Sequence, residues 1–245
     1  MSTASAANEG DDTTKILPFY LVIDASYSME GERLDEANNY LPVLTDALLE
    51  NPIVNDKARF SLIDFANDAR VVLPMCDLTK QTELPVLTAR GGTSYAAAFK
   101  LLRDQIDVDV QLLKDDGFAV FRPAVFFISD GQPTDEHGVW KQAFREITEY
   151  LSETGEGNKN YPNVVPFGVD EADLDTMKQL IHPPKRSKAF MQASGATPQE
   201  ALAEIAEILI ATTLESGHKG GLRLPDADDT PEGIEIHDAY EEDLI

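Results

Sequence analysis

Cysteine is almost absent from this sequence, and so are the short motifs of several enzyme classes. Cys76 is the one cysteine in 245 residues, so no disulfide can form within the chain and a cysteine-rich zinc site is excluded. No Gly-x-x-x-x-Gly-Lys-(Ser/Thr) loop occurs, so the sequence gives no support to an ATPase. The lack of a Gly-x-Ser-x-Gly elbow argues against a hydrolase with a Ser-His-Asp triad. We therefore expect a protein that is not an enzyme.

Positive charge and long apolar runs are also scarce. The chain has 20 Lys and Arg against 44 Asp and Glu, a net charge of −24. Because phosphate binding needs clustered Lys and Arg, this balance argues against nucleic acid or an anionic membrane as a partner. Apolar runs such as Ala124–Ile128 are far too short to cross a bilayer, and the polar start lacks the features of a signal peptide. We expect a soluble, cytoplasmic protein.

Composition divides the chain into three parts. Residues 1–14 are small, polar and acidic, which is typical of a disordered segment. Residues 216–245 carry two basic residues against nine acidic ones and few large apolar side chains, which predicts a disordered acidic tail. The 201 residues between them, 15–215, are long enough for one domain with a sizeable core.

Strand and helix patterns alternate through this middle part. Apolar runs at Ile16–Ile23, Pro123–Ser129 and Asn163–Val169 predict buried strands. Arg59–Phe65 and Ala69–Met75 are joined by three residues, too few for a parallel crossover, so these two strands should be antiparallel. Lys188–Met191 could form a last edge strand. The pattern predicts an α/β fold, a doubly wound, mostly parallel central sheet with one antiparallel edge strand and helices on both faces.

Apolar residues recur at spacings of three and four between these strands, as expected of helices that cover a sheet. Such stretches run from Leu34 to Leu48, from Tyr95 to Ile106, from Trp140 to Leu151, from Leu174 to Ile181 and from Ala201 to Thr212. Pro42 lies inside the first stretch and should kink it.

Polar residues at strand ends are where such a fold places its ligands. Asp24-Ala25-Ser26-Tyr27-Ser28 follows the first strand, Gly91-Gly92-Thr93-Ser94 precedes a helix, and Ser129-Asp130-Gly131 follows the central strand. These segments offer carboxylate and hydroxyl oxygens only. Oxygen donors suit a hard cation such as Mg²⁺, with Mn²⁺ or Ca²⁺ as alternatives, and argue against zinc or copper.

The alternation Asp-x-Ser-x-Ser has a geometric consequence. In an extended turn, residues two apart point the same way, so Asp24, Ser26 and Ser28 could converge on one ion. Mg²⁺ prefers six ligands and keeps several waters, which leaves a replaceable position. Neutral hydroxyls leave much of the ion's charge uncompensated, which favours an incoming Asp or Glu of a partner.

From about Leu17 to Thr213 the chain resembles von Willebrand factor A (vWA) and integrin I domains. The metal-ion-dependent adhesion site (MIDAS) of this family has five ligand positions, which match Asp24, Ser26, Ser28, Thr93 and Asp130. The resemblance implies direct metal contacts from the three hydroxyls, with the two carboxylates often acting through water. Tyr27 stands where the family commonly has Gly, and its ring could shape the rim of the site.

Two segments, Ile128–Asp135 and Gly91–Ser94, look most like bacterial TerY-type proteins, which are linked to tellurium-resistance and stress gene clusters. That resemblance implies an intracellular, cation-dependent scaffold with kinase-like or phosphatase partners. An accessory subunit of an AAA+ ATPase assembly, of the MoxR or chelatase type, is the first alternative. A metal-dependent hydrolase ranks last.

Simpler roles exist for several of these residues. Asp24, Thr93 and Asp130 could merely cap helices, because Asp, Ser and Thr satisfy free N–H groups at helix starts. Asp135 is expected to be such a cap, and Asp170 to serve a turn, although it could also line the rim of the site. Asp64 lies within a strand pattern and should be paired or at an edge. The completeness of the five positions favours metal binding over capping.

Overall fold

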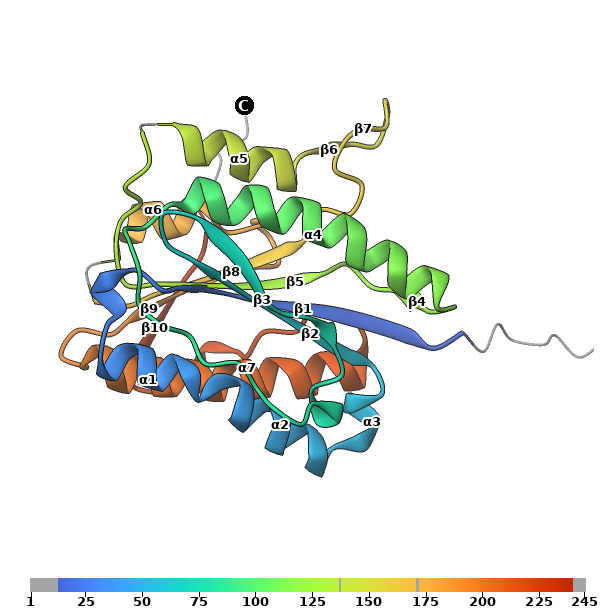
Figure 1. Cartoon of the computed structure of the whole chain (residues 1–245), viewed down its shortest axis with the longest axis horizontal. Coiled ribbons are helices and arrows are strands. Elements are labelled where there is room, and N and C mark those ends of the chain that lie inside the picture. Colours follow the sequence, from blue (N-terminus) through green and yellow to red (C-terminus); the bar gives the residue numbers. More distant parts are fainter. Residues whose placement is uncertain (1–12, 137, 171, 240–245) are drawn as a thin grey trace, which may run out of the picture.

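The computed structural model describes residues 13–136, 138–170 and 172–239. Its main sheet has the strand order β10-β9-β8-β5-β1-β2-β3, with β4 paired beside the start of β1 (Figure 1). The strands are β1 (Lys15–Asp24), β2 (Ala58–Phe65), β3 (Ala69–Cys76), β4 (Ala119–Val120), β5 (Ala124–Ser129), β8 (Asn163–Gly168), β9 (Ala189–Gln192) and β10 (Ile234–His237). A separate hairpin pairs β6 (Tyr150–Leu151) with β7 (Glu156–Gly157).

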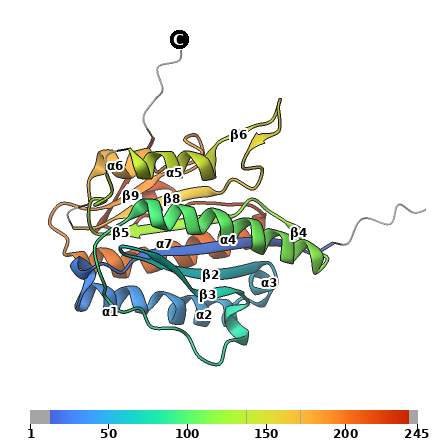
Figure 2. The ribbon, with the colours of Figure 1, turned by 45° about the horizontal axis from the view of Figure 1, so that its top comes forward.

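Helices cover both faces of this sheet (Figures 1 and 2). One face carries α1 (Glu32–Asn38), α2 (Tyr40–Glu50), α3 (Pro52–Asn55) and α7 (Pro198–Lys219). The other face carries α4 (Tyr95–Asp115), α5 (Val139–Thr148) and α6 (Leu174–Gln179). Short 3₁₀ turns lie at Tyr27–Met29, Leu78–Lys80 and Ala227–Asp229. No helix in the described part of the chain has the length and apolar character needed to span a membrane.

The central strand shows why the two layers form. Phe19, Leu21 and Ile23 of β1 pack in one hydrophobic cluster, whereas Tyr20 and Val22 pack in the other. Successive side chains of a strand point to opposite faces, so a strand apolar at every position requires cover on both sides. β1 is parallel to both β2 and β5. The continuous apolar run therefore fixes β1 in the middle of a sheet with two helical layers.

The predicted fold class is confirmed, and so is the antiparallel pairing of β2 with β3. The expected interruption near Pro42 is present, because one helix ends at Asn38 and the next begins at Tyr40. Pro42 then lies in the first turn of α2, where a missing N–H costs no helical hydrogen bond. The expected edge strand is β9, but it is not the last strand, because β10 pairs antiparallel outside it.

The structure contradicts the predicted disordered tail at residues 216–219, which belong to α7, and at residues 234–237, which form β10. α7 continues to Lys219, and β10 joins the sheet with Ile234 opposite Gln192 and His237 opposite Ala189. Ile234 is buried, and Gly220 with a φ of 75° follows the C-terminus of α7. The acidic composition of this segment predicts disorder, although it contains a short Ile-Glu-Ile pattern. This pattern forms a strand because it pairs with β9 in the folded sheet. Residues 240–245, like residues 1–12 of the predicted N-terminal segment, lie outside the described residues.

Candidate functional site

Two of the three candidate loops leave the sheet side by side. The strand order turns at β1 and β5, which are neighbours with Ile23 opposite Ile128. Asp24 and Ser129 therefore end adjacent parallel strands, and Ser129 Oγ donates to Asp24 Oδ2 at 2.7 Å. This junction is a switch point in strand order, the position where open α/β sheets bind ligands.

Four of the five predicted ligands form one chain of short contacts. The backbone N–H of Ser26 donates to Asp24 Oδ1 at 2.8 Å, and the Ser26 and Ser28 hydroxyl oxygens lie 2.8 Å apart. Ser28 Oγ donates to Asp130 Oδ1 at 2.7 Å. The expected same-side orientation of the Asp-x-Ser-x-Ser residues is thus present, and it brings together loops 102 residues apart in sequence.

The loop that carries Thr93 is tied to the Asp-x-Ser-x-Ser loop through Gly91. The Gly91 carbonyl accepts a hydrogen bond from Tyr27 N at 3.1 Å, which joins the glycine loop to the Asp-x-Ser-x-Ser loop. Thr134 donates to the Thr93 carbonyl from both its backbone N–H, at 2.8 Å, and its hydroxyl, at 3.0 Å. Thr93 is buried, and in the described part of the chain no hydrogen bond joins its hydroxyl to the other four residues.

The two carboxylates of the cluster have different electrostatic surroundings. Both Asp24 and Asp130 are buried, but only Asp130 has an ion-pair partner, Arg33, among the described residues. Burial raises the pKa of Asp24 from 3.8 to about 6; hydrogen bonds from Ser26 and Ser129 oppose this rise, and the charge of Asp130 adds to it. Asp24 is a buried acid without a compensating cation, which is a costly arrangement for its ionised form.

Arg33 is the site residue that sequence reasoning missed. Its Nη1 donates to Asp130 Oδ2 at 2.9 Å and to the Ser28 carbonyl at 2.7 Å, and its Nη2 lies 2.7 Å from Asp170 Oδ2. Asp170, expected to serve a turn or to line the rim of the site, is linked to Asp130 through this arginine. One signal was available, because Arg33 is the one basic residue between Asp24 and Lys57.

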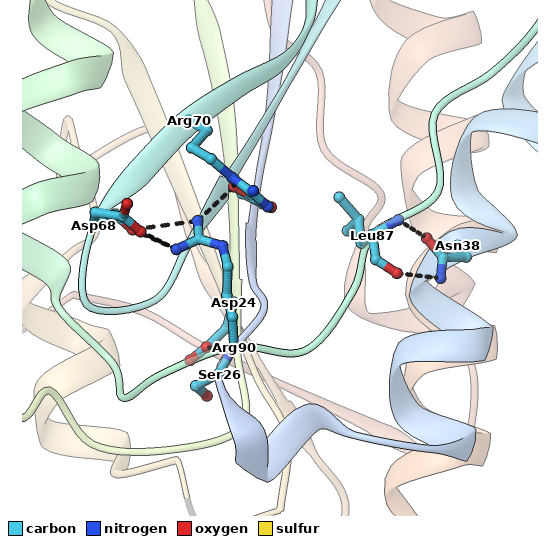
Figure 3. A network of polar contacts seen from close by, with 8 residues as sticks. Asp24, Ser26, Asn38, Asp68, Arg70, Leu87 and Arg90 are labelled. Carbon is cyan, nitrogen blue, oxygen red and sulfur yellow. Dashed lines mark hydrogen bonds and ion pairs between the residues drawn. The ribbon is translucent and has the colours of Figure 1, made fainter.

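A second ionic cluster supports the loop before Thr93. The buried carboxylate of Asp64 pairs with Arg90 at 2.7 Å and with Arg70, as expected of a charge within a strand. Arg90 also pairs with Asp68, and Figure 3 shows it between Asp68 and Arg70, with Asp24 and Ser26 nearby. Hydrogen bonds and charges from Arg70 and Arg90 outweigh the effect of burial and hold the pKa of Asp64 below its usual value.

Two further contacts fix the loops around the cluster. Asn38 accepts a hydrogen bond from Leu87 N at 2.7 Å and donates one to the Leu87 carbonyl at 3.2 Å, which holds the segment before the glycine loop against α1 (Figure 3). Asp135 caps a helix, as predicted, but the helix is α4. It accepts hydrogen bonds from Ser94 Oγ at 2.6 Å and from Ala96 N at 3.1 Å.

The donor set is chemically consistent with a hard cation. It contains two carboxylates, of Asp24 and Asp130, and the hydroxyls of Ser26 and Ser28, with Thr93 on the adjoining loop. Among the described residues, no three His, Cys, Asp or Glu side chains gather as they do in a zinc site or an all-carboxylate site. Oxygen-only sites of this kind suit Mg²⁺ or Mn²⁺ better than softer metals.

Comparison with known proteins bears on the fold of the chain. Residues 19–132 match the family model of the von Willebrand factor type A domain. The chain has the vWA fold. The matched residues include all of the candidate metal ligands, from Asp24 at the end of β1 to Asp130 directly after β5. No curated protein matches the chain.

Several solved structures share the vWA fold at low sequence identity. A von Willebrand factor type A protein from Catenulispora acidiphila has a TM-score of 0.55 and 16% identity, over 82% of this chain and 43% of its own. The pilus adhesin SpaC from Lactobacillus rhamnosus GG has a TM-score of 0.53 and 14% identity, over 82% and 30%. The ArnB paralog VWA2 from Sulfolobus acidocaldarius has 0.50 and 16%, over 82% and 46%. The chain thus spans less than half of each of these proteins.

Proposed function

We propose that this vWA domain binds a divalent cation, Mg²⁺ in the first instance, and uses it to hold a carboxylate of a protein partner. Asp24, Ser26, Ser28, Thr93 and Asp130 are the proposed ligands. The vWA domain commonly mediates metal-dependent protein interactions, and this proposal assigns that role to one cluster of residues.

The observation that carries the proposal is the buried, unpaired carboxylate of Asp24 beside two hydroxyls and a second carboxylate. An ionised Asp24 at this position is unfavourable by itself, because burial removes water without supplying a cation. A divalent ion would supply the missing charge, and the hydroxyl oxygens would complete part of its shell. The neutral hydroxyls would leave positive charge on the ion for an acidic partner.

Isothermal titration of the full chain with MgCl₂ and MnCl₂ tests the proposal. Asp24→Asn keeps the shape of the side chain but removes its charge, so it should abolish measurable binding. Asp104→Asn removes one charge from an exposed position on α4 and should bind like the wild type. Equal heats from wild type and Asp24→Asn would contradict the metal site.

The partner can be sought by the same logic. A pull-down from the native host with Mg²⁺, compared with a chelator and with the Asp24→Asn protein, should recover proteins that depend on both the metal and Asp24. An intracellular location and a TerY-type role in tellurium resistance or stress response stay predictions. Kinase, phosphatase or AAA+ components among the recovered proteins would separate the TerY-type role from the ATPase-accessory one.

A further inference from the structure

Arg33 already occupies the carboxylate that the metal would need. It extends from α1, where its side chain is 26% exposed, to Asp130, whose side chain is fully buried. Both oxygens of Asp130 are engaged, Oδ1 by the Ser28 hydroxyl at 2.7 Å and Oδ2 by the guanidinium at 2.9 Å. The Ser28 carbonyl also accepts from the guanidinium, at 2.7 Å. The arginine is thus bonded to two of the residues that make up the proposed metal site.

A guanidinium and a divalent cation cannot share this position without cost. Two positive charges on one carboxylate repel each other, and the repulsion is strong at a buried site because little water screens it. A metal ion that binds Asp130 must therefore weaken or break the contact from Arg33. The same contact also stabilises the metal-free protein, since a buried carboxylate without a cation is unfavourable.

Asp170 gives the arginine a second position. Its carboxylate lies 2.7 Å from Nη2, so the guanidinium can keep this partner when Nη1 leaves Asp130 and Ser28. Asp170 follows β8 and has a φ of 52°, a left-handed conformation that is uncommon outside glycine. Arg33 therefore has one anchor inside the cluster and one at its edge.

We propose that Arg33 is a built-in competitor of the metal, which sets the affinity of the site by pairing with Asp130 when no cation is bound. This inference rests on the proposed function, because it requires that the cluster binds a divalent ion. In this proposal Arg33 pairs with both Asp130 and Asp170 when no metal is bound. When a metal ion binds, the guanidinium leaves Asp130 and pairs with Asp170 alone. The affinity for Mg²⁺ is then lower than the five oxygen ligands would give by themselves.

The test compares Mg²⁺ affinities of full-length variants by isothermal titration. Arg33→Gln removes the competing charge and should bind Mg²⁺ about tenfold more tightly than the wild type, as expected when a close like charge is removed. Arg103→Gln is the matched control, because Arg103 is an exposed arginine of α4 that pairs with Glu146 at 3.6 Å away from the cluster. It makes the same change in net charge and should stay within about twofold of the wild type.

Thermal unfolding with and without Mg²⁺ supplies a second measurement. A purely structural role for Arg33 would not change the rise in unfolding temperature that Mg²⁺ causes. In chelator, Arg33→Gln should unfold at a lower temperature than the wild type, because Asp130 has lost its cation. Saturating Mg²⁺ should raise that temperature more in Arg33→Gln than in the wild type, since ligand stabilisation grows with affinity. If Arg33→Gln does not fold, Arg33→Met decides, because it also removes the competing charge while it keeps a long unbranched side chain, and Mg²⁺ should again bind more tightly.

The outcomes separate this inference from the proposed function. Unchanged Mg²⁺ affinity in the folded Arg33 variants, with clear binding by the wild type, would overturn the competitor role and leave the metal site standing. No binding of Mg²⁺ or Mn²⁺ by any variant would overturn both. Binding by Arg33→Gln but not by the wild type would support the competitor role while contradicting the proposed function of the unmodified chain.

Discussion

Asn67 Oδ1 accepts a hydrogen bond from the backbone N–H of Gly92 at 2.8 Å, which ties the turn between β2 and β3 to the loop that carries Thr93. The approach is close enough to require glycine. A Cβ on Gly91 would lie 2.8 Å from the Asn67 side-chain nitrogen, and Gly91 has a φ of 61°. The two glycines before Thr93 therefore let this loop approach Asn67 closely.

Gly91→Ala should destabilise the protein by about 1–2 kcal/mol, the usual cost of a left-handed conformation for a residue with a Cβ. It should also weaken Mg²⁺ binding, because Asn67 must shift and the loop before Thr93 with it. Urea unfolding and Mg²⁺ titration measure the two effects. Gly131→Ala is the control for stability, since its Cβ would meet nothing within 4 Å, and an equal loss there would contradict this account.

Asp64→Asn should destabilise the protein by about 3 kcal/mol, the low end for breaking a buried ion pair. Arg90 would lose its buried partner beside the glycine loop, while Arg70 is half exposed and can turn to water. Arg70→Gln should therefore cost less than Asp64→Asn, about 1 kcal/mol, because Asp64 keeps Arg90. Chemical denaturation of both variants checks this order, and the reverse order would show that Arg70 is the main partner.

Mg²⁺ binding should weaken as the pH falls through about 6. Burial raises the pKa of Asp24 to about 6, so near pH 5 most of the metal-free protein carries a protonated Asp24, which is a poor ligand. The affinity near pH 5 should be about tenfold lower than near pH 7.5, and binding near pH 6 should release protons. Titrations in two buffers with different ionisation heats measure both effects.

The folding stability of the metal-free protein depends on pH in the opposite direction to its affinity for Mg²⁺. Because the folded pKa of Asp24 lies above the unfolded value of 3.8, its contribution to the metal-free protein is fully present below pH 3.8 and is lost as the pH rises through about 6. The stabilisation gained from Mg²⁺ should grow over the same range. An affinity for Mg²⁺ that stays flat from about pH 5 to 7.5 would show that Asp24 is ionised throughout, contrary to its burial.

The sequence predicts the sheet and most of the site because those features depend on the residue types and spacing within short segments. β1 is apolar at consecutive positions, so it must be covered on both faces. The Asp-x-Ser-x-Ser motif marks three oxygen donors, but Ser28 meets the others through a 3₁₀ turn at Tyr27–Met29 and not through extended backbone. The meeting of this loop with Asp130 then follows from the parallel arrangement, which puts the ends of β1 and β5 together.

The contacts made across long distances could not be predicted in this way. Arg33 pairs with Asp130, which is 97 residues away, and a lone arginine in an acidic stretch has many candidate partners. Asp135 was recognisable as a cap, but the helix it serves begins 40 residues earlier, at Tyr95. Such pairings depend on which strand ends become neighbours, so they can be identified only when the strand order of the sheet is known.

The final strand provides a test of the corrected boundary. Ile234 of β10 is 6% exposed and packs in the same hydrophobic cluster as Leu202 and Ile205 of α7. Ile234→Ala should therefore cost about 2–4 kcal/mol in urea unfolding, the usual loss for a large buried side chain. Ile53→Ala removes the same atoms from a residue that is 65% exposed and should change stability by less than about 0.5 kcal/mol. Equal small effects of both variants would mean that this strand contributes nothing to the fold, as expected of an acidic tail and contrary to its pairing with β9.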